Sequence, residues 1–175
     1  MHFQFIHIPK TGGTSVEHVL GKQELHSCAL EAKQHCSAEF ILRDSRETFC
    51  TVRDPYARVV SAANHRKAKN LNEWVSKHVG ESKENKDKKD NNIVLPSSEF
   101  VFREDGTRVC DHVLKFETLK KDFCALTGAE SCELPHAMVS TDKFSVKDLS
   151  SASIDLINNV YARDFENFGY AQKFE

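Results

Sequence analysis

The feature that most constrains this chain is a short apolar run that ends in a lysine and a pair of glycines. Residues 5–15 read Phe-Ile-His-Ile-Pro-Lys-Thr-Gly-Gly-Thr-Ser. The run predicts a strand over 2–8, and the hydroxyl residues after the glycines open a predicted helix over 14–20. Glycines let backbone N–H groups approach an anion, and a helix N-terminus adds more N–H groups. This turn is therefore typical of a site that binds phosphate or sulfate oxygens.

The order of the residues in this turn separates it from a related loop. Lys10 precedes Gly12 and Gly13, whereas in the nucleotide-triphosphatase loop, G-x-x-x-x-G-K-[ST], the lysine follows the glycines. That other spacing occurs nowhere in the chain. Lys10 supplies a positive charge, and Thr11, Thr14 and Ser15 supply hydroxyl donors. The alternative is an ordinary strand-to-helix turn with a solvated lysine.

A second segment has a similar design. A β-prone run predicts a strand over 47–52, and a helix over 55–69 follows because Asp54 is a natural N-cap and Pro55 fits the first helical position. Arg53 then lies at the carboxyl end of the strand, where open α/β sheets bind their ligands. Ser61 lies two turns into the helix. An arginine and a hydroxyl suit a terminal phosphate, although surface charges beside an ordinary cap would look alike.

Four segments together resemble one family. They are Ile8–Ser15, Arg53–Ser61, Leu114–Leu119 and Tyr161–Tyr170. In this order they resemble the sulfotransferase superfamily, whose sulfate donor is 3'-phosphoadenosine 5'-phosphosulfate (PAPS). The first segment is similar to the family's 5'-phosphosulfate loop and the second to its 3'-phosphate motif. The last is similar to the branch that contains many carbohydrate (Golgi-type) sulfotransferases.

The resemblance and the alternation of strands with helices lead to one expected fold. We expect an α/β chain with a small three-layer, P-loop-like fold and a central, mainly parallel sheet flanked by helices. A single sulfotransferase domain over 1–175 fits a chain of 175 residues that is 39% hydrophobic.

The resemblance also implies roles for individual residues. Lys10 is expected to meet the bridging oxygen of the leaving phosphate during transfer. Arg53 and Ser61 are expected to hold the 3'-phosphate, which distinguishes PAPS from ATP. The product would be adenosine 3',5'-bisphosphate (PAP), and no metal is expected. The residues expected to bind the cofactor are Lys10, Thr11, Gly12, Gly13, Thr14, Ser15, Arg53 and Ser61.

The catalytic base is less well defined by the sequence. An acceptor hydroxyl needs a base with a pKa near the working pH, and relatives place a histidine or glutamate between the two cofactor motifs. We choose His26, and the alternatives are Glu31, His35 and Glu39. The His-x-His arrangement of uronosyl 2-O-sulfotransferases is absent. Two further acids in the resembling segments, Glu117 and Asp164, are interpreted as structural.

Charge and hydropathy limit the partners. The net charge is −2 with 29% charged residues, so no overall field favours nucleic acid or another polyanion. The chain contains no run of about 18 apolar residues, so we expect neither a membrane segment nor a signal peptide in it. We expect a glycan or another hydroxyl compound as acceptor, with Arg58, Arg66, Lys67 and Lys69 as candidates for a basic groove. The chain is expected to be soluble as given, either cytoplasmic or a Golgi-lumenal domain without its anchor. The sequence leaves the oligomeric state open.

The remaining segments carry further expectations. Helices are predicted over 27–34, 71–79, 118–127 and 148–167, and a mobile loop over 80–92. An Asp-Gly turn at 105–106 predicts a hairpin between 100–103 and 109–116.

Six cysteines favour free thiols, with a Cys124–Cys132 disulfide as an alternative. A zinc site is a remote alternative whose ligands would be His26, Cys28, His35 and Cys36.

Two other functions are alternatives to a sulfotransferase. A P-loop-like nucleotide kinase would require magnesium and ATP, and the position of Lys10 argues against it. A non-catalytic module that binds PAPS would bind the cofactor without turnover.

Overall fold

The computed structural model describes residues 3–20, 27–28, 38–42, 45–80, 91–129, 133–134 and 143–174. The chain divides into two compact units. The sheet unit comprises Met1–Arg53 and Glu99–Val139, and the helical unit comprises Asp54–Ser98 and Ser140–Glu175. That the two units act as one domain stays a prediction.

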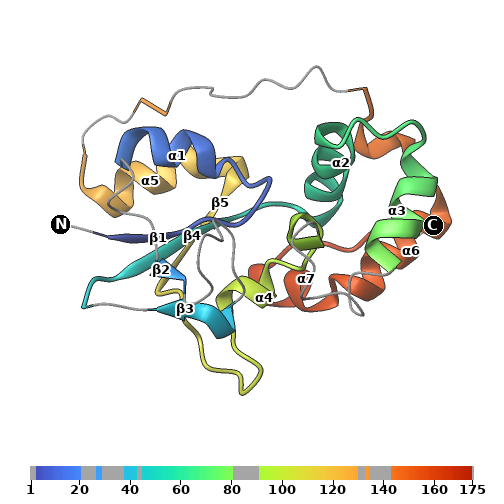
Figure 1. Cartoon of the computed structure of the whole chain (residues 1–175). Helices are drawn as coiled ribbons and strands as arrows, with labels where there is room; N and C mark the ends of the chain where they lie inside the picture. The colour runs from blue at the N-terminus through green and yellow to red at the C-terminus, as the bar shows by residue number, and fades with distance from the viewer. Residues whose placement is uncertain are drawn as a thin grey trace. The chain divides into compact units, whose positions relative to one another are not determined.

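The sheet unit is built on three parallel strands. They are β1 (Gln4–Ile6), β4 (Thr48–Val52) and β5 (His112–Lys115), in the order β1-β4-β5 (Figure 1). Phe5 pairs with Phe49, and Cys50 pairs with Val113. The predicted α/β class, the parallel sheet and the central position of the strand before Arg53 are confirmed, whereas the P-loop-like identity stays a prediction.

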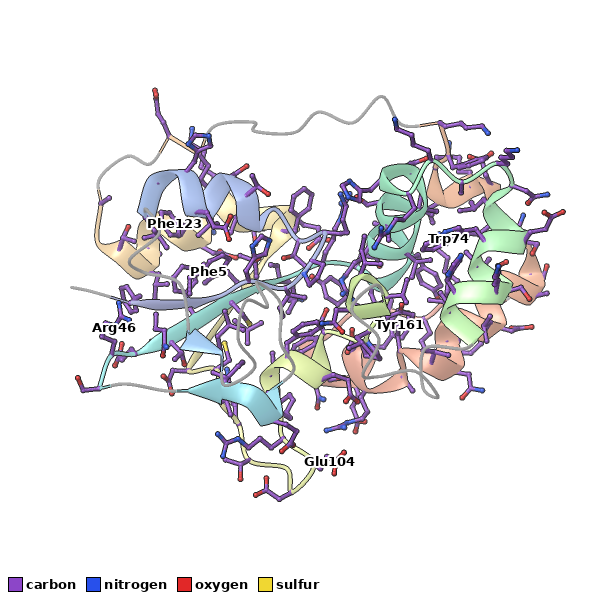
Figure 2. All side chains as sticks on the ribbon, viewed as in Figure 1. Phe5, Arg46, Trp74, Glu104, Phe123 and Tyr161 are labelled. Atoms are coloured by element: carbon purple, nitrogen blue, oxygen red, sulfur yellow. The ribbon has the colours of Figure 1, made fainter. Side chains whose placement is uncertain are left out.

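Two helices cover one face of this sheet. They are α1 (Gly13–Leu20) and α5 (Leu119–Thr127), which lie together above the strands in Figure 1. Alternate residues of a strand point to one face, and on this face aromatic rings fill the space under the helices (Figure 2). The Phe5 and Phe49 rings lie 4.9 Å apart, and the Phe49 and Phe123 rings 5.9 Å apart. The buried members of this cluster are Phe3, Phe5, Val16, Phe49, Leu114, Leu119 and Phe123.

The sequence predicts the ends of β4 and α5 closely, whereas the strand expected over 2–8 is the shorter β1. Every residue of β4 is buried, as expected for a central parallel strand rich in β-branched and aromatic residues. The helix expected over 118–127 is α5, and it follows a 3₁₀ turn, η4 (Phe116–Thr118). It ends at Gly128, whose φ of 69° is the left-handed conformation that closes many helices.

The expected helix over 27–34 is wrong at its start. Ser27–Cys28 forms strand β2, which pairs antiparallel with β3 (Ile41–Leu42). Pairing with a distant segment therefore outweighs the local helix preference there. A 3₁₀ turn, η2 (Ala38–Phe40), precedes β3, and residues 29–37 lie outside the described residues.

The expected hairpin around 105–106 shrinks to one antiparallel bridge, Phe102 with Arg108. Its first arm instead forms a short helix, α4 (Ser98–Val101). The second arm turns toward β4, because the Asp111 carboxylate accepts hydrogen bonds from the Thr48 amide and hydroxyl, both at 2.8 Å. β5 then pairs parallel to β4.

The helical unit consists of α2 (Pro55–His65), α3 (Leu71–Gly80), α6 (Ser151–Val160) and α7 (Ala162–Phe168), with short turns η3 (Asn91–Ile93) and η5 (Val146–Asp148). α2 starts as predicted, because the Asp54 carboxylate accepts a 2.9 Å hydrogen bond from the Ala57 amide and Pro55 opens the helix. Buried apolar residues of α2, α3, α6 and α7 share one core.

The single helix expected over 148–167 is two helices. The backbone leaves the helical conformation at Tyr161, with φ −101° and ψ 21°. The Tyr161 hydroxyl donates a hydrogen bond to the buried carbonyl of Val94. This long-range anchor holds the residue at the break, and the local sequence gives no sign of it.

Arg58 corrects one expectation. It is only 1% exposed, so it does not line a basic groove. Its guanidinium donates to the Leu95 carbonyl at 2.7 Å and to the Ile93 carbonyl at 3.4 Å. Burial lowers the pKa of Arg58, and the charge of Asp164 opposes that shift. Arg66, Lys67 and Lys69 are exposed.

Asp164 has the structural role that the sequence indicates. The carboxylate is 1% exposed and accepts from the Ser97 amide at 2.6 Å and the Ser98 amide at 2.8 Å, where α4 begins. Burial raises the pKa of Asp164, and Arg58 and these hydrogen bonds act against the rise. Arg58 thus binds the first part of the segment 93–98, and Asp164 binds its last two residues.

The expectation of free thiols is confirmed for Cys50 and Cys110, which are free and buried, and is wrong for Cys124, which is disulfide-bonded. Cys132 lies outside the described residues, so its pairing with Cys124 stays a prediction.

Most of the mobile loop expected over 80–92 also lies outside the described residues, which omit 81–90. The described ends of that range belong to α3 and η3. Within the described ranges, no helix has the length and apolar character needed to cross a membrane.

We expect Arg58→Met to lower the free energy of unfolding by about 3 kcal/mol, because it leaves the buried Asp164 carboxylate without its neighbouring cation. Chemical denaturation would measure the change. Arg163→Met, at the exposed neighbour of Asp164, is the matched control and should change stability by less than about 0.5 kcal/mol. Equal effects of the two substitutions would contradict the role of Arg58.

Candidate anion-binding site

The loop between β1 and α1 has the backbone of an anion-binding turn. Lys10 has φ 67° and Gly12 has φ 85°, so two of its residues are left-handed. α1 begins at Gly13, and the Ser15 amide donates to the Gly12 carbonyl at 3.0 Å, which closes the turn onto the helix. A left-handed residue beside a helix N-terminus turns successive N–H groups toward one point.

Thr11 ties this loop to the central strand. Its side chain is fully buried, and its hydroxyl donates to the Ile8 carbonyl at 2.8 Å. That hydroxyl has a single proton, so the 2.7 Å contact with the Thr51 hydroxyl must have Thr51 as donor. The Thr11 hydroxyl is thus occupied within the protein, and a contribution of Thr11 to anion binding rests on its amide.

Both glycines are required by close neighbours. A Cβ on Gly12 would lie 2.9 and 3.0 Å from two atoms of the Phe116 ring, and its φ of 85° disfavours a side chain. A Cβ on Gly13 would lie 2.3 Å from Cδ2 and 2.4 Å from Nε2 of His7. The two glycines therefore allow the loop to pack tightly as well as to approach an anion.

His7 packs beside the loop and contacts both β1 and α1. Its ring is 7% exposed and stacks on Phe5, with ring centres 5.6 Å apart. Nδ1 lies 2.6 Å from a Glu17 carboxylate oxygen on α1. Burial lowers the pKa of His7 from its ordinary 6.5, although Glu17 acts in the opposite direction. His7 therefore joins β1 to α1 on either side of the turn.

Arg53 reaches the same loop from the neighbouring strand. It directly follows β4, and its Nη1 lies 3.5 Å from the Lys10 carbonyl oxygen. Its guanidinium carbon lies 4.3 Å from the centre of the Phe116 ring, which is a cation–π contact. Two cationic residues, Lys10 and Arg53, thus flank one left-handed turn at the carboxyl edge of the sheet.

The structure brings together most of the expected cofactor residues. Lys10, Thr11, Gly12, Gly13 and Arg53 form one cluster, and the first turn of α1 adds the exposed Thr14 and half-buried Ser15. Ser61 is half-buried on α2 of the helical unit. Its pairing with Arg53 stays a prediction.

The expected base lies outside the part of the chain that the structure describes, as do Glu31 and His35. Glu39 is described: it is exposed on η2, and its carboxylate accepts from the Glu104 amide at 2.6 Å. The choice of His26 therefore stays a prediction.

The zinc site, an unfavoured alternative, also stays a prediction. Three of its expected ligands, His26, His35 and Cys36, fall among undescribed residues. Among the described residues, no group of three or more His, Cys, Asp or Glu side chains is arranged to hold a metal ion.

Sequence reasoning missed two residues, His7 and Phe116. Each had a signal: His7 immediately precedes the Ile-Pro-Lys turn, and Phe116 belongs to the segment Leu114–Leu119 that the family resemblance includes. The sequence does not show which residues come into contact in the fold. Phe116 lies about a hundred positions from Gly12, the glycine that its ring covers.

The chain matches no family model, and neither a curated protein nor a solved structure shows significant similarity to it. Any assignment therefore depends on the motifs and on this geometry.

We expect Gly13→Ala to destabilise the chain by about 2 kcal/mol, because the new methyl group overlaps a ring that Phe5 and Glu17 hold in place. Thermal and denaturant unfolding would measure it. Gly80→Ala is the control, since nothing lies within 4 Å of a Cβ at that position. In a His7→Ala background the cost of Gly13→Ala should fall by at least half, and an unchanged cost would exclude the overlap as its cause.

The free energy of unfolding should fall as the pH drops from 7.5 to 5.5. Unfolded His7 takes up a proton near pH 6.5, whereas the folded ring resists protonation until a lower pH. Denaturation at several pH values should show a shallower fall for His7→Gln than for the unsubstituted chain. Identical pH slopes would show that His7 contributes nothing to this dependence.

Proposed function

We propose that this chain is a sulfotransferase that moves the sulfuryl group of PAPS to an acceptor hydroxyl of a carbohydrate. One observation carries the proposal: Arg53, at the end of β4, lies against the left-handed turn that holds Lys10. Two cations beside a glycine turn suit a ligand with more than one anionic group.

The proposed division of labour follows the charges of the donor. The amides of residues 11–14 and the hydroxyls of Thr14 and Ser15 hold the 5'-phosphosulfate. Arg53, together with Ser61, holds the 3'-phosphate. The order Lys-x-Gly-Gly places the lysine before the glycines, which favours this donor over a magnesium-bound triphosphate.

The proposed reaction is a single transfer of the sulfuryl group. The acceptor oxygen forms a bond to sulfur while the bond from sulfur to the bridging phosphate oxygen breaks. The proton of the acceptor hydroxyl goes to the base, for which we propose His26, and PAP leaves with the electron pair. Lys10 stabilises the negative charge that develops on the leaving oxygen.

We expect Lys10→Ala to reduce transfer of radiolabelled sulfate from PAPS by about a hundredfold or more, because the charge that stabilises the leaving oxygen is lost. The assay would use a panel of glycans and other hydroxyl compounds as acceptors. Lys120→Ala, at an exposed lysine of α5, is the matched control and should keep full activity. Normal turnover by Lys10→Ala would refute the assigned role.

The alternatives are distinguished when calorimetry is added to the transfer assay. A non-catalytic module would bind PAP in calorimetry but transfer no sulfate to any acceptor. A nucleotide kinase would bind ATP in the presence of magnesium and would not bind PAP.

A further inference from the structure

The Phe116 side chain is a partly exposed aromatic ring at the carboxyl end of β5. It follows β5 and keeps 37% of its surface exposed. Its ring nonetheless has two close partners in the anion-binding site. One is the Arg53 guanidinium, and the other is the bare Cα of Gly12. Phe116 thus connects the loop after β1 to the arginine after β4.

The missing side chain of Gly12 makes room for the ring. A Cβ on Gly12 would come within 3.0 Å of the ring atoms Cδ2 and Cε2, so the ring occupies the space that a side chain would need. Leu119 also borders this space, since its Cδ2 lies 3.3 Å from the same Cβ position. The Phe116 ring therefore packs closely against the anion-binding loop.

The ring in turn contacts Arg53. The Arg53 guanidinium lies 3.5 Å from the Lys10 carbonyl oxygen, at the outer limit of a hydrogen bond. Its cation–π contact with the Phe116 ring, at 4.3 Å, further restricts the orientation of the guanidinium plane. A contact with the face of the ring uses none of the guanidinium N–H donors. An arginine ordered before the ligand arrives loses less side-chain entropy on binding.

From this geometry we propose that Phe116 is a positioning residue, which orients Arg53 and so sets the preference of the site for a ligand with a second phosphate. The inference rests on the proposed function, in which Arg53 holds the 3'-phosphate. Phe116 acts through Arg53 and leaves binding of the 5'-group by the loop unaffected.

The test compares two nucleotides on the full chain by calorimetry: PAP, which has both phosphates, and adenosine 5'-monophosphate, which lacks the 3'-phosphate. Phe116→Leu removes the ring face but keeps an apolar side chain against Gly12. We expect this substitution to weaken PAP binding about fivefold and to change binding of the monophosphate by less than twofold. Phe116→Tyr keeps the ring face and should restore the preference. Phe174→Leu, at a phenylalanine that is 80% exposed, is the matched control.

A double-mutant cycle separates positioning from a general packing effect. In an Arg53→Ala background, Phe116→Leu should weaken PAP binding no further, because the residue that it positions is gone. Melting temperatures of all variants would show whether each one folds.

Each outcome has one meaning. If the unsubstituted chain prefers PAP and Phe116→Leu loses that preference only when Arg53 is present, the inference is supported. An unchanged preference in Phe116→Leu, or equal losses with and without Arg53, would overturn the inference and leave the proposed function intact. Failure of the unsubstituted chain to bind PAP would overturn the proposed function and this inference with it.

Discussion

A buried pair of hydroxyl groups holds the candidate site together. Thr51 on the central strand donates to Thr11 on the loop, and Thr11 donates to the Ile8 carbonyl. This short chain of hydrogen bonds fixes the turn against β4. Arg53 follows Thr51 by two positions, the spacing that returns a side chain to the same face of a strand. The contact that anchors the loop therefore also sets where the arginine can meet it.

Several elements are predictable from the sequence because local chemistry decides them. A β-prone run predicts β4, the Asp-Pro pair predicts the start of α2, and a glycine predicts the end of α5, each close to where the structure has it. The predictions fail where a distant partner decides. β2 pairs with β3, the arm at 109–111 bonds to Thr48, and Tyr161 is held at a break by the Val94 carbonyl.

The residues of the candidate site also fall into two groups, those that the sequence predicts and those that only the fold reveals. The glycines, Lys10 and Arg53 were predictable because each belongs to a short motif with a physical reason for its order. Their neighbours were not, since Gly12 meets Phe116 and Gly13 meets His7 only after the chain has folded. The burial of Arg58 is a further case: its sequence context resembles a solvated helix face, yet its guanidinium is buried and donates to the carbonyls of Ile93 and Leu95. The neighbourhood of an acceptor therefore has to be sought among the exposed cations rather than at this arginine.

The backbone at Lys10 has a consequence for how the chain can change. An L-residue with φ near 67° costs about 1 kcal/mol more than glycine would in the same place. Replacing this lysine with glycine would relax the turn and raise the melting temperature, and under the proposed chemistry it would also remove the group that stabilises the leaving oxygen. Thermostability and turnover thus oppose each other at this position, so a search for more heat-resistant variants would select inactive ones here.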